Sequence, residues 1–216
     1  KDGRQEILPK PSIDTGMGLE RITAIMEGKD HNFASSLFAP LIAQISKKTG
    51  VSYEALTDPA QKVSFHVMAD HIRAITFLIS DGVIPSKDGR GYVLRRIMRR
   101  AMRHAKKASF PLEGLSDLAH VMVESYGDHY SELKQNENVI QDVILDEKKK
   151  FSDTLDRGMG MLQDEIKALK QTKAVVFPGA KAFHLYDTYG FPKDLTQDVL
   201  RESNLSLDER GFEQAF

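Results

Sequence analysis

The 216-residue sequence contains no cysteine and no tryptophan. The lack of cysteine excludes disulfide bonds and thiolate metal sites, and it is compatible with a reducing compartment. The sequence also lacks an apolar run of the roughly 20 residues that a membrane-spanning helix requires. We therefore expect a cytoplasmic location and no membrane partner.

A large excess of either charge is also missing. The chain has 30 lysines and arginines against 31 aspartates and glutamates, which gives a formal net charge of −1. Binding of nucleic acid would therefore depend on clustered charges and not on the total charge. The length is sufficient for one full core, or for one domain with part of a second.

The two ends of the sequence suggest a fragment. The first residue is Lys1 and not methionine, and residues 1–4 are charged, unlike the start of a signal peptide. The last residues, 211–216, resemble a helix that is cut partway. We expect an internal piece of a longer protein.

Hydrophobic spacing predicts a mainly α fold. Residues 6–28 are interpreted as a strand, a glycine turn and a helix, because Pro9 and Pro11 exclude a regular helix at the start and Gly28 ends the later apolar pattern. The segment 175–191 reads as short extended pieces and turns. Further helices are predicted at residues 34–49, 59–81, 91–107, 112–126, about 132–171 and 192–203.

Two of these helices carry more detailed expectations. The helix at 34–49 has Ser35 or Ser36 as its expected cap. The helix at 59–81 is expected to bury one apolar side, which we assign to Val63, Val67, Ala74, Phe77 and Leu78.

A glycine motif stands at the predicted start of the first helix. Gly16 and Gly18 allow a ligand to approach the backbone, and a helix N-terminus offers free N–H groups to an anion. Arg21 is positioned to reach a phosphate or carboxylate, and Asp14 to hold a cationic amine. The alternative is an ordinary glycine pair with a solvated Arg21. Spacing alone favours this alternative, because short glycine motifs are common.

The predicted helix at 91–107 is rich in basic residues and has no acidic ones. An apolar stripe, Leu94, Ile97, Met98, Ala101 and Ala105, is expected to pack inward. The opposite face would then be broadly cationic, and a nucleic-acid backbone would relieve its repulsion. The alternatives are a solvated face, or arginines paired with acids from 137–165. The basic residues are Arg95, Arg96, Arg99, Arg100, Arg103, Lys106 and Lys107.

Metal binding is not expected. His66 and His71 are five positions apart, which does not place them on one helical face, and the His-Glu-x-x-His pattern is absent. We expect Asp70 or Arg73 to form a buried ion pair between helices, and His104 to lie at the surface. From its residue types, the segment 185–192 is a packed aromatic turn with Asp187 as a cap.

Several segments resemble alanyl-tRNA synthetases, which are class II aminoacyl-tRNA synthetases. Residues 13–21, Ile-Asp-Thr-Gly-Met-Gly-Leu-Glu-Arg, resemble the third signature motif of that class in its alanine-specific form. Residues 69–74, 80–86, 90–97 and 185–192 resemble the helical domain that reads the tRNA acceptor stem. The resemblance implies that Arg21 contacts the ATP phosphates, that Asp14 pairs with the amino group of alanine, and that Gly16 and Gly18 line that pocket.

The resemblance also implies a set of RNA contacts. Asp187 would accept a hydrogen bond from the G·U wobble pair of the acceptor stem, in the minor groove. The asparagine that reads this pair in the family is missing from the loop at 86–90, where Lys87, Asp88 and Gly89 stand instead. The implied tRNA contacts are Lys87, Arg90, Arg95, Arg96, Arg99, Arg100, Arg103 and Asp187.

Taken together, the sequence predicts residues 1–29 as the end of a class II catalytic domain and residues 30–216 as a helical acceptor-stem domain. The whole enzyme would use ATP, Mg²⁺, alanine and the alanine tRNA, with no DNA partner. The first two class II motifs are not recognised, so we expect this chain alone to bind no cofactor tightly and not to aminoacylate. The alternative is a non-enzymatic helical domain that serves as a scaffold or binds nucleic acid.

Overall fold

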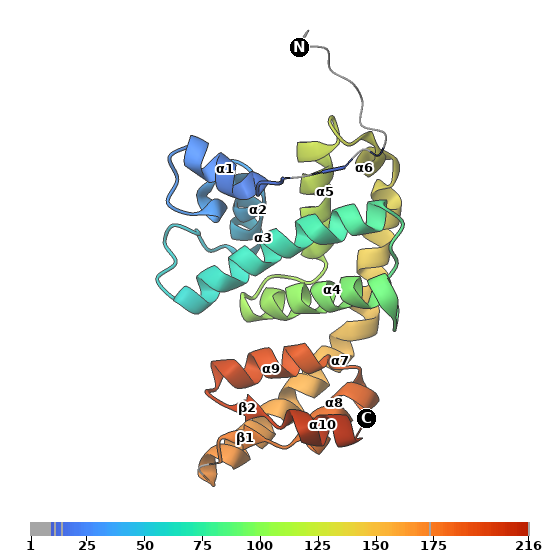
Figure 1. Cartoon of the computed structure of the whole chain (residues 1–216). Helices are drawn as coiled ribbons and strands as arrows, with labels where there is room; N and C mark the ends of the chain where they lie inside the picture. Colours follow the sequence, from blue (N-terminus) through green and yellow to red (C-terminus); the bar gives the residue numbers. More distant parts are fainter. Residues whose placement is uncertain (1–9, 11, 14, 173, 216) are drawn as a thin grey trace, which may run out of the picture. The chain divides into compact units, whose positions relative to one another are not determined.

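The computed structural model describes residues 10, 12–13, 15–172 and 174–215. The fold is mainly α, as predicted, and its described strands form one two-stranded sheet (Figure 1). The chain divides into two compact units, Lys1–Pro40 and Leu41–Phe216. The domain boundary expected after residue 29 remains a prediction.

The first unit contains helix α1, Leu19–Met26, and the short 3-10 helix η1, Asn32–Ala34. Gly28 adopts a positive φ of 64° and ends α1, as predicted. The Glu27 carboxylate then accepts hydrogen bonds from the Ser36 amide at 2.8 Å and from the Ser36 hydroxyl. No strand occurs at residues 10, 12–13 or 15–18, the described part of the predicted strand and turn.

Helix α2, Ala39–Thr49, begins later than predicted. Neither serine caps it, because Ser36 contacts Glu27 and the Ser35 hydroxyl donates to the Asn32 carbonyl at 2.6 Å. Helix α3, Pro59–Ser80, begins as its sequence indicates. Its cap, Asp58, accepts a hydrogen bond from the Ala60 amide at 2.9 Å.

The buried side of α3 differs from the predicted one. Val63 is 50% exposed, and Val67, Ala74, Phe77 and Leu78 are only partly buried. The prediction was wrong because α3 has apolar residues on two sides. The side that packs inward is the one on which apolar residues follow one another along the whole helix. The buried residues are Ser64, Phe65, Met68, Ala69, Ile72, Ile75, Thr76 and Ile79.

Three helices follow α3 in the second unit: α4, Gly89–Lys107, α5, Gly114–Tyr126, and α6, Ser131–Gln135. They pack around α3 and the beginning of α7, Glu137–Gln171. The long helix predicted at 132–171 is therefore interrupted at Asn136. The Asn136 side-chain amide donates to the Ser80 carbonyl at 3.2 Å, which fixes the break against the end of α3.

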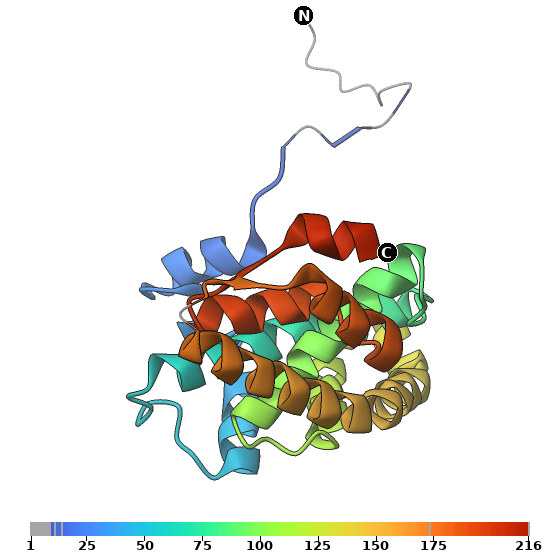
Figure 2. The same ribbon diagram turned by 90° about the horizontal axis from the view of Figure 1, so that it is seen from below.

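Three further helices lie beside the second half of α7 (Figures 1 and 2). They are α8, Gly179–Tyr189, α9, Lys193–Glu202, and α10, Glu209–Ala215. Strands β1, Val176–Phe177, and β2, Ser206–Leu207, pair in parallel. The prediction of extended pieces and turns at 183–191 was wrong for most of that segment, which is α8. Gly190, with a φ of 60°, ends this helix.

Phe191, which lies between α8 and α9, packs against α7. Its ring is fully buried, and a Cβ atom added to Gly158 of α7 would lie 2.6 Å from its Cδ2 atom. Gly158 is therefore a site of close approach, where the missing side chain lets the ring reach the helix backbone.

Candidate nucleic-acid interface

Helix α4 holds the basic residues, but it does not expose all of them. Arg99 and Arg103 are 6% and 5% exposed, so the expectation of a broad, solvent-facing cationic face was wrong for both. The apolar stripe expected beneath them is largely confirmed, since Leu94, Met98, Ala101 and Ala105 are buried and Ile97 is half-buried. The arginines are buried because acids from other helices reach them.

Arg99 connects three elements of the second unit. Its Nε donates to Glu147 Oε1 on α7 at 2.7 Å, and its Nη1 donates to the Gly190 carbonyl at the end of α8. The guanidinium also lies 4.3 Å from the centre of the Phe151 ring. Burial lowers the pKa of Arg99 from its ordinary value, while Glu147 opposes this shift.

A row of ion pairs, here called the α4–α9 ladder, joins α4 to α9. Asp194, Asp198 and Glu202 stand four residues apart on α9, so they share one face of that helix. Burial raises the pKa of Asp194, and Arg96 opposes this. The pairs are Arg96–Asp194 at 3.0 Å, Arg100–Asp198 at 3.4 Å, Arg103–Glu202 at 2.8 Å and Lys107–Glu202 at 3.2 Å.

The ladder matches the alternative in which the arginines pair with acids. That alternative placed the acids in 137–165, where Glu147 and Asp156 do pair with Arg99 and Lys106. The acids on α9 were missed. Their four-residue spacing was a visible signal, because it repeats the spacing from Arg96 to Arg100.

The loop at residues 86–90, here called the basic loop, leads into α4 and leaves its basic side chains exposed. Lys87 and Arg90 are exposed, and Arg95 on the first half of α4 is half-buried. The loop turns tightly, with the Ser86 hydroxyl donating to the Asp88 carbonyl at 2.7 Å. A Cβ atom on Gly91 would lie 2.9 Å from Ser86 Cβ, so the loop folds closely over the start of the helix.

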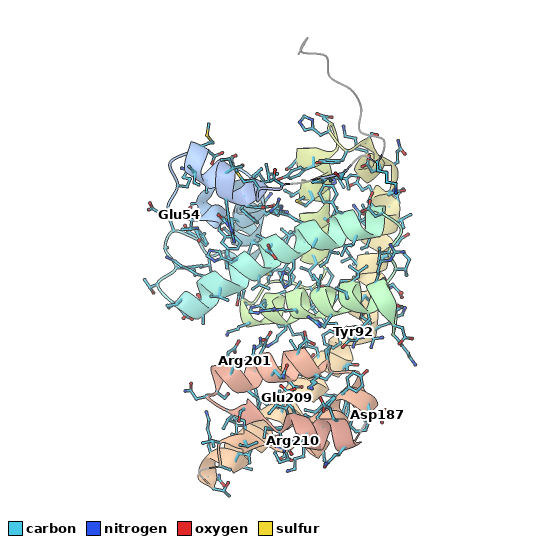
Figure 3. The ribbon with its side chains drawn as sticks, viewed as in Figure 1. Glu54, Tyr92, Asp187, Arg201, Glu209 and Arg210 are labelled. Atoms are coloured by element: carbon cyan, nitrogen blue, oxygen red, sulfur yellow. The ribbon has the colours of Figure 1, made fainter. Side chains whose placement is uncertain are left out.

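Asp187 lies within α8, so its expected role as the cap of a turn was wrong. Its side chain is exposed, on the last turn before Gly190. Gly190 approaches α4, because a Cβ atom on it would lie 3.2 Å from Arg99 Nη1 and 3.9 Å from Arg95 Nη2. Figure 3 shows Asp187 on the same side of the second unit as Tyr92 of α4.

Tyr92 lies where α4 meets α8 and α9. Burial raises its pKa, and the nearby Asp194 and Tyr186 raise it further. The Arg96–Asp194 pair and the approach of Gly190 place this part of α4 beside both helices. The structure thus brings the end of α8, the helix that carries Asp187, against Arg95, and it directs Arg96, Arg100 and Arg103 toward α9 instead.

The glycine motif belongs to the first unit. Gly16 and Gly18 are exposed and precede α1, whose first backbone turn begins at Gly18. Among the described residues, no atom lies within 4 Å of a Cβ built on Gly16, so this part of the structure leaves the backbone there open to a ligand. Arg21 is exposed on the first turn of α1. The predicted Asp14 lies outside the described residues.

One further prediction was wrong, and another is decided for only one of its two residues. His104 is 3% exposed and not at the surface, because it packs against α3, with its Nδ1 3.2 Å from the Ser64 hydroxyl. Burial and the neighbouring cations, Arg103 first, lower its pKa to about 4. The buried ion pair between helices was expected of Asp70 or Arg73. The Asp70 side chain is 56% exposed and lies 2.9 Å from His71 on the same helix, and for Arg73 the expectation stays a prediction.

No group of three or more histidines, aspartates or glutamates in the described part of the chain is placed to hold a metal ion. None of the described helices combines the length and apolarity needed to cross a membrane.

Comparison with known proteins covers the entire sequence. Residues 1–216 match the family described as tRNA synthetases class II (A). The chain is 44% identical over 208 residues to an alanine–tRNA ligase of Desulfitobacterium hafniense, and this match covers 96% of the chain and 24% of the relative. It is 48% identical over 212 residues to that of Campylobacter jejuni, covering 98% and 24%.

A third alanine–tRNA ligase, from Idiomarina loihiensis, is 49% identical over 218 residues, covering 99% of the chain and 24% of the relative. The chain thus spans about a quarter of the length of the relatives that it matches. On the match to its full length, the chain belongs to the class II tRNA synthetases.

Proposed function

We propose that this chain is part of an alanine–tRNA ligase and that its second unit binds the acceptor stem of the alanine tRNA. The observation that carries the proposal is that Asp187 is exposed on α8, whose end at Gly190 meets the first half of α4, on the side of Tyr92. The names of the relatives, all alanine–tRNA ligases, agree with it.

In this proposal the basic residues at the start of α4 provide affinity. Lys87, Arg90 and Arg95 contact phosphates, which bind without regard to base sequence. Arg96 and Arg100 are 47% and 43% exposed in the ladder, so they can share their charge between α9 and RNA.

Arg99 and Arg103 are assigned a positioning role, because both are buried against acids. Arg99 holds the end of α8 against α4 through the Gly190 carbonyl. Because Asp187 lies three residues earlier on the same helix, Arg99 fixes the place from which that carboxylate faces the RNA.

Asp187 provides specificity. A carboxylate only accepts hydrogen bonds when ionised, and the exocyclic amine of guanine is a donor in the shallow minor groove of RNA. In a G·U pair this amine is not paired to a cytosine carbonyl. Asp187 therefore accepts a hydrogen bond that a G·C pair offers less readily.

The first unit forms one wall of the adenylation site in the whole enzyme. Open backbone at Gly16, the N-terminus of α1 and exposed Arg21, whose side chain lies against Gly18, fit the phosphates of ATP. Asp14 is proposed to hold the amino group of alanine. We assign no Mg²⁺ ligand to this chain, since its described part offers no suitable group of acids. On its own the chain is proposed not to aminoacylate, and turnover by it alone would contradict this.

The test is a gel-shift titration at fixed salt. It uses the alanine tRNA with its G·U pair and the same tRNA with G·C at that position. We expect the G·U form to bind about tenfold more tightly, since one good base contact discriminates by roughly 1–3 kcal/mol. Asp187→Asn should remove the preference, and Asp142→Asn, at an exposed position of α7, should keep it.

Equal and weak binding to both RNAs by the unmodified chain would refute acceptor-stem reading. That result would leave the alternative function, a helical scaffold with a generic affinity for nucleic acid. Loss of the preference in both variants would refute the role of Asp187 while keeping acceptor-stem binding.

A further inference from the structure

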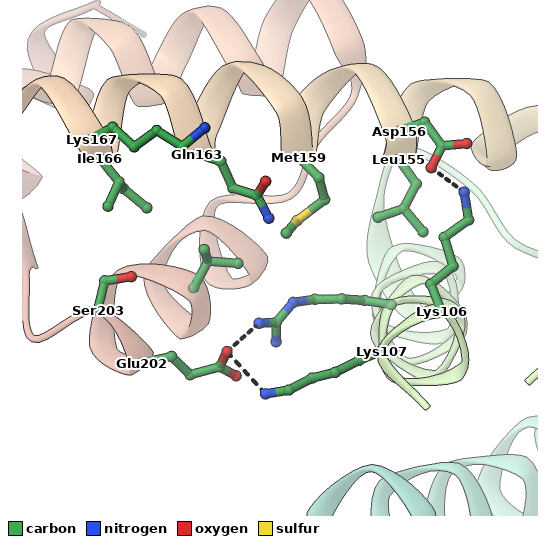
Figure 4. Close-up of a pocket in the computed structure, with 12 residues that line it drawn as sticks. Lys106, Lys107, Leu155, Asp156, Met159, Gln163, Ile166, Lys167, Glu202 and Ser203 are labelled. Carbon is green, nitrogen blue, oxygen red and sulfur yellow. Dashed lines mark hydrogen bonds and ion pairs between the residues drawn. The ribbon is translucent and has the colours of Figure 1, made fainter. Parts of the chain in front are cut away.

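A cavity of about 540 Å³ lies at the end of α4 remote from the basic loop. Its walls come from the last turns of α4, the middle of α7 and the end of α9 (Figure 4). The volume falls in the range of sites for small molecules. None of the residues proposed above to contact RNA phosphates directly lines it.

One wall of the cavity is apolar. Leu155 and Ile166 of α7 and Val199 of α9 contribute it, and all three are buried. Met159 lies between them along α7 and is half-buried. Figure 4 shows Met159, Gln163 and Ile166 projecting from α7 into the same space. Such a wall suits a flat apolar body, and the Gln163 amide provides a hydrogen-bonding group beside it.

The lining also carries charged side chains from all three helices. They are Arg103, Lys106, Lys107, Lys167, Asp156 and Glu202. Four positive and two negative side chains line the cavity, and Lys167 is also paired with Asp164 at 3.3 Å. An anion would balance the remaining positive charge of the lining.

Arg103 shows where such an anion would bind. Its Nη2 donates to Glu202 Oε2 at 2.8 Å, and Lys107 shares the same oxygen at 3.2 Å. Its Nη1 is buried and has no hydrogen-bond partner among the residues that the structure describes. A buried donor without a partner is costly, so a small shift of the Arg103 side chain that brings this nitrogen to a ligand oxygen would be stabilised.

We propose that this cavity binds a small phosphate monoester with a flat apolar body, of the nucleoside monophosphate class. The phosphate contacts Arg103 and Lys107, and Lys167 approaches it from α7. The base lies along the apolar wall near Met159. This site is separate from the proposed acceptor-stem surface, so either proposal can fail without the other.

Calorimetric titration of the whole chain tests the proposal with three probes. Adenosine monophosphate carries both parts of the ligand, inorganic phosphate carries only the charge, and adenosine carries only the body. We expect the monophosphate to bind about tenfold more tightly than either partial probe, because the apolar wall and the charged side chains both contribute only in that case.

Matched variants locate the site. Lys107→Gln and Lys167→Gln should each weaken binding of the monophosphate about tenfold, the effect of losing one charged hydrogen bond. Lys170→Gln makes the same change at an exposed position of α7 outside the cavity lining, and it should leave binding unchanged. Urea unfolding of each variant verifies that it is folded.

Three results would overturn the proposal. The first is no saturable heat with the monophosphate up to about 1 mM, which corresponds to roughly 4 kcal/mol of binding free energy. The second is equal weakening by Lys170→Gln and by the two cavity variants. The third is binding of inorganic phosphate as tight as that of the monophosphate, which would exclude a role for the apolar wall.

Discussion

Arg99 and Glu147 form an ion pair whose side chains are only 8% and 4% exposed, with Nε and Oε1 2.7 Å apart. The pair ties α4 to α7, and the same guanidinium holds the Gly190 carbonyl at the end of α8. Two buried charges stabilise each other only while both are present.

Loss of one partner should therefore be costly. We expect Arg99→Met to reduce the free energy of unfolding by about 3–5 kcal/mol, because Glu147 would remain buried without its partner. Urea denaturation measures this. Lys150→Met breaks the exposed pair with Asp146 and serves as the control, with a much smaller effect. Equal losses in the two variants would show that Arg99 contributes no more than a surface charge.

The close approach of Phe191 to α7 gives a second prediction. Gly158→Ala should lower the free energy of unfolding by about 1–3 kcal/mol, because its Cβ would overlap the buried ring. Gly160→Ala is the matched control, since no atom lies within 4 Å of its added Cβ. Alanine there should stabilise the helix by about 0.5–1 kcal/mol. A gain in stability at both positions would contradict the packing.

His104 predicts a loss of stability in mild acid. Its folded-state pKa is about 4, below the 6.5 of the free side chain, so between these values the unfolded chain binds more protons. Its contribution is complete above pH 6.5 and is lost as the pH falls toward 4. The expected loss between pH 7 and pH 5 is about 2 kcal/mol.

Urea unfolding of the protein and of His104→Gln at both pH values isolates this contribution. The difference between the two proteins should shrink in acid, because the variant lacks the titrating group. His120, whose pKa is raised chiefly by its hydrogen bond to Glu137, is present in both and cancels. A difference that does not change with pH would show that His104 titrates normally.

Salt dependence distinguishes phosphate contacts from buried arginines. For each of Lys87→Ala and Arg90→Ala we expect the slope of log K against log salt to fall by about 1 in tRNA binding. Lys47→Ala, at an exposed position of α2, should leave the slope unchanged. Filter binding between low and moderate salt measures this. Slopes that stay equal to that of the unmodified chain would remove the basic loop from the interface.

Helices with clear local signals were predictable from the sequence. Helix α3 has Asp58 and Pro59 at its start and Gly82 after its end, and its bounds were predicted within one residue. Helix α8 was missed because Pro178 and Gly190 read as turn residues around a short aromatic segment. Its rings pack on α10, with the centres of Phe183 and Phe212 5.8 Å apart. Contacts between such distant segments leave no local pattern.

The candidate site was predictable in part. The spacing showed a basic helix with an apolar stripe, and the stripe is largely buried. It did not show that Arg99 and Arg103 point away from solvent, because burial depends on which helices face α4. Equal spacing of acids on α9 and arginines on α4 permits pairing, but only the fold brings these two faces together.

Helix α7 runs unbroken for 35 residues, which at 1.5 Å per residue is about 50 Å. It packs on α4 and α5 at one end and on α8 farther along. Figures 1 and 2 show that α7 bends between these two groups of contacts, so its two halves point in different directions. The direction of the second half of α7, together with the contacts of Arg99 and Phe191, therefore sets where Asp187 stands relative to the basic loop.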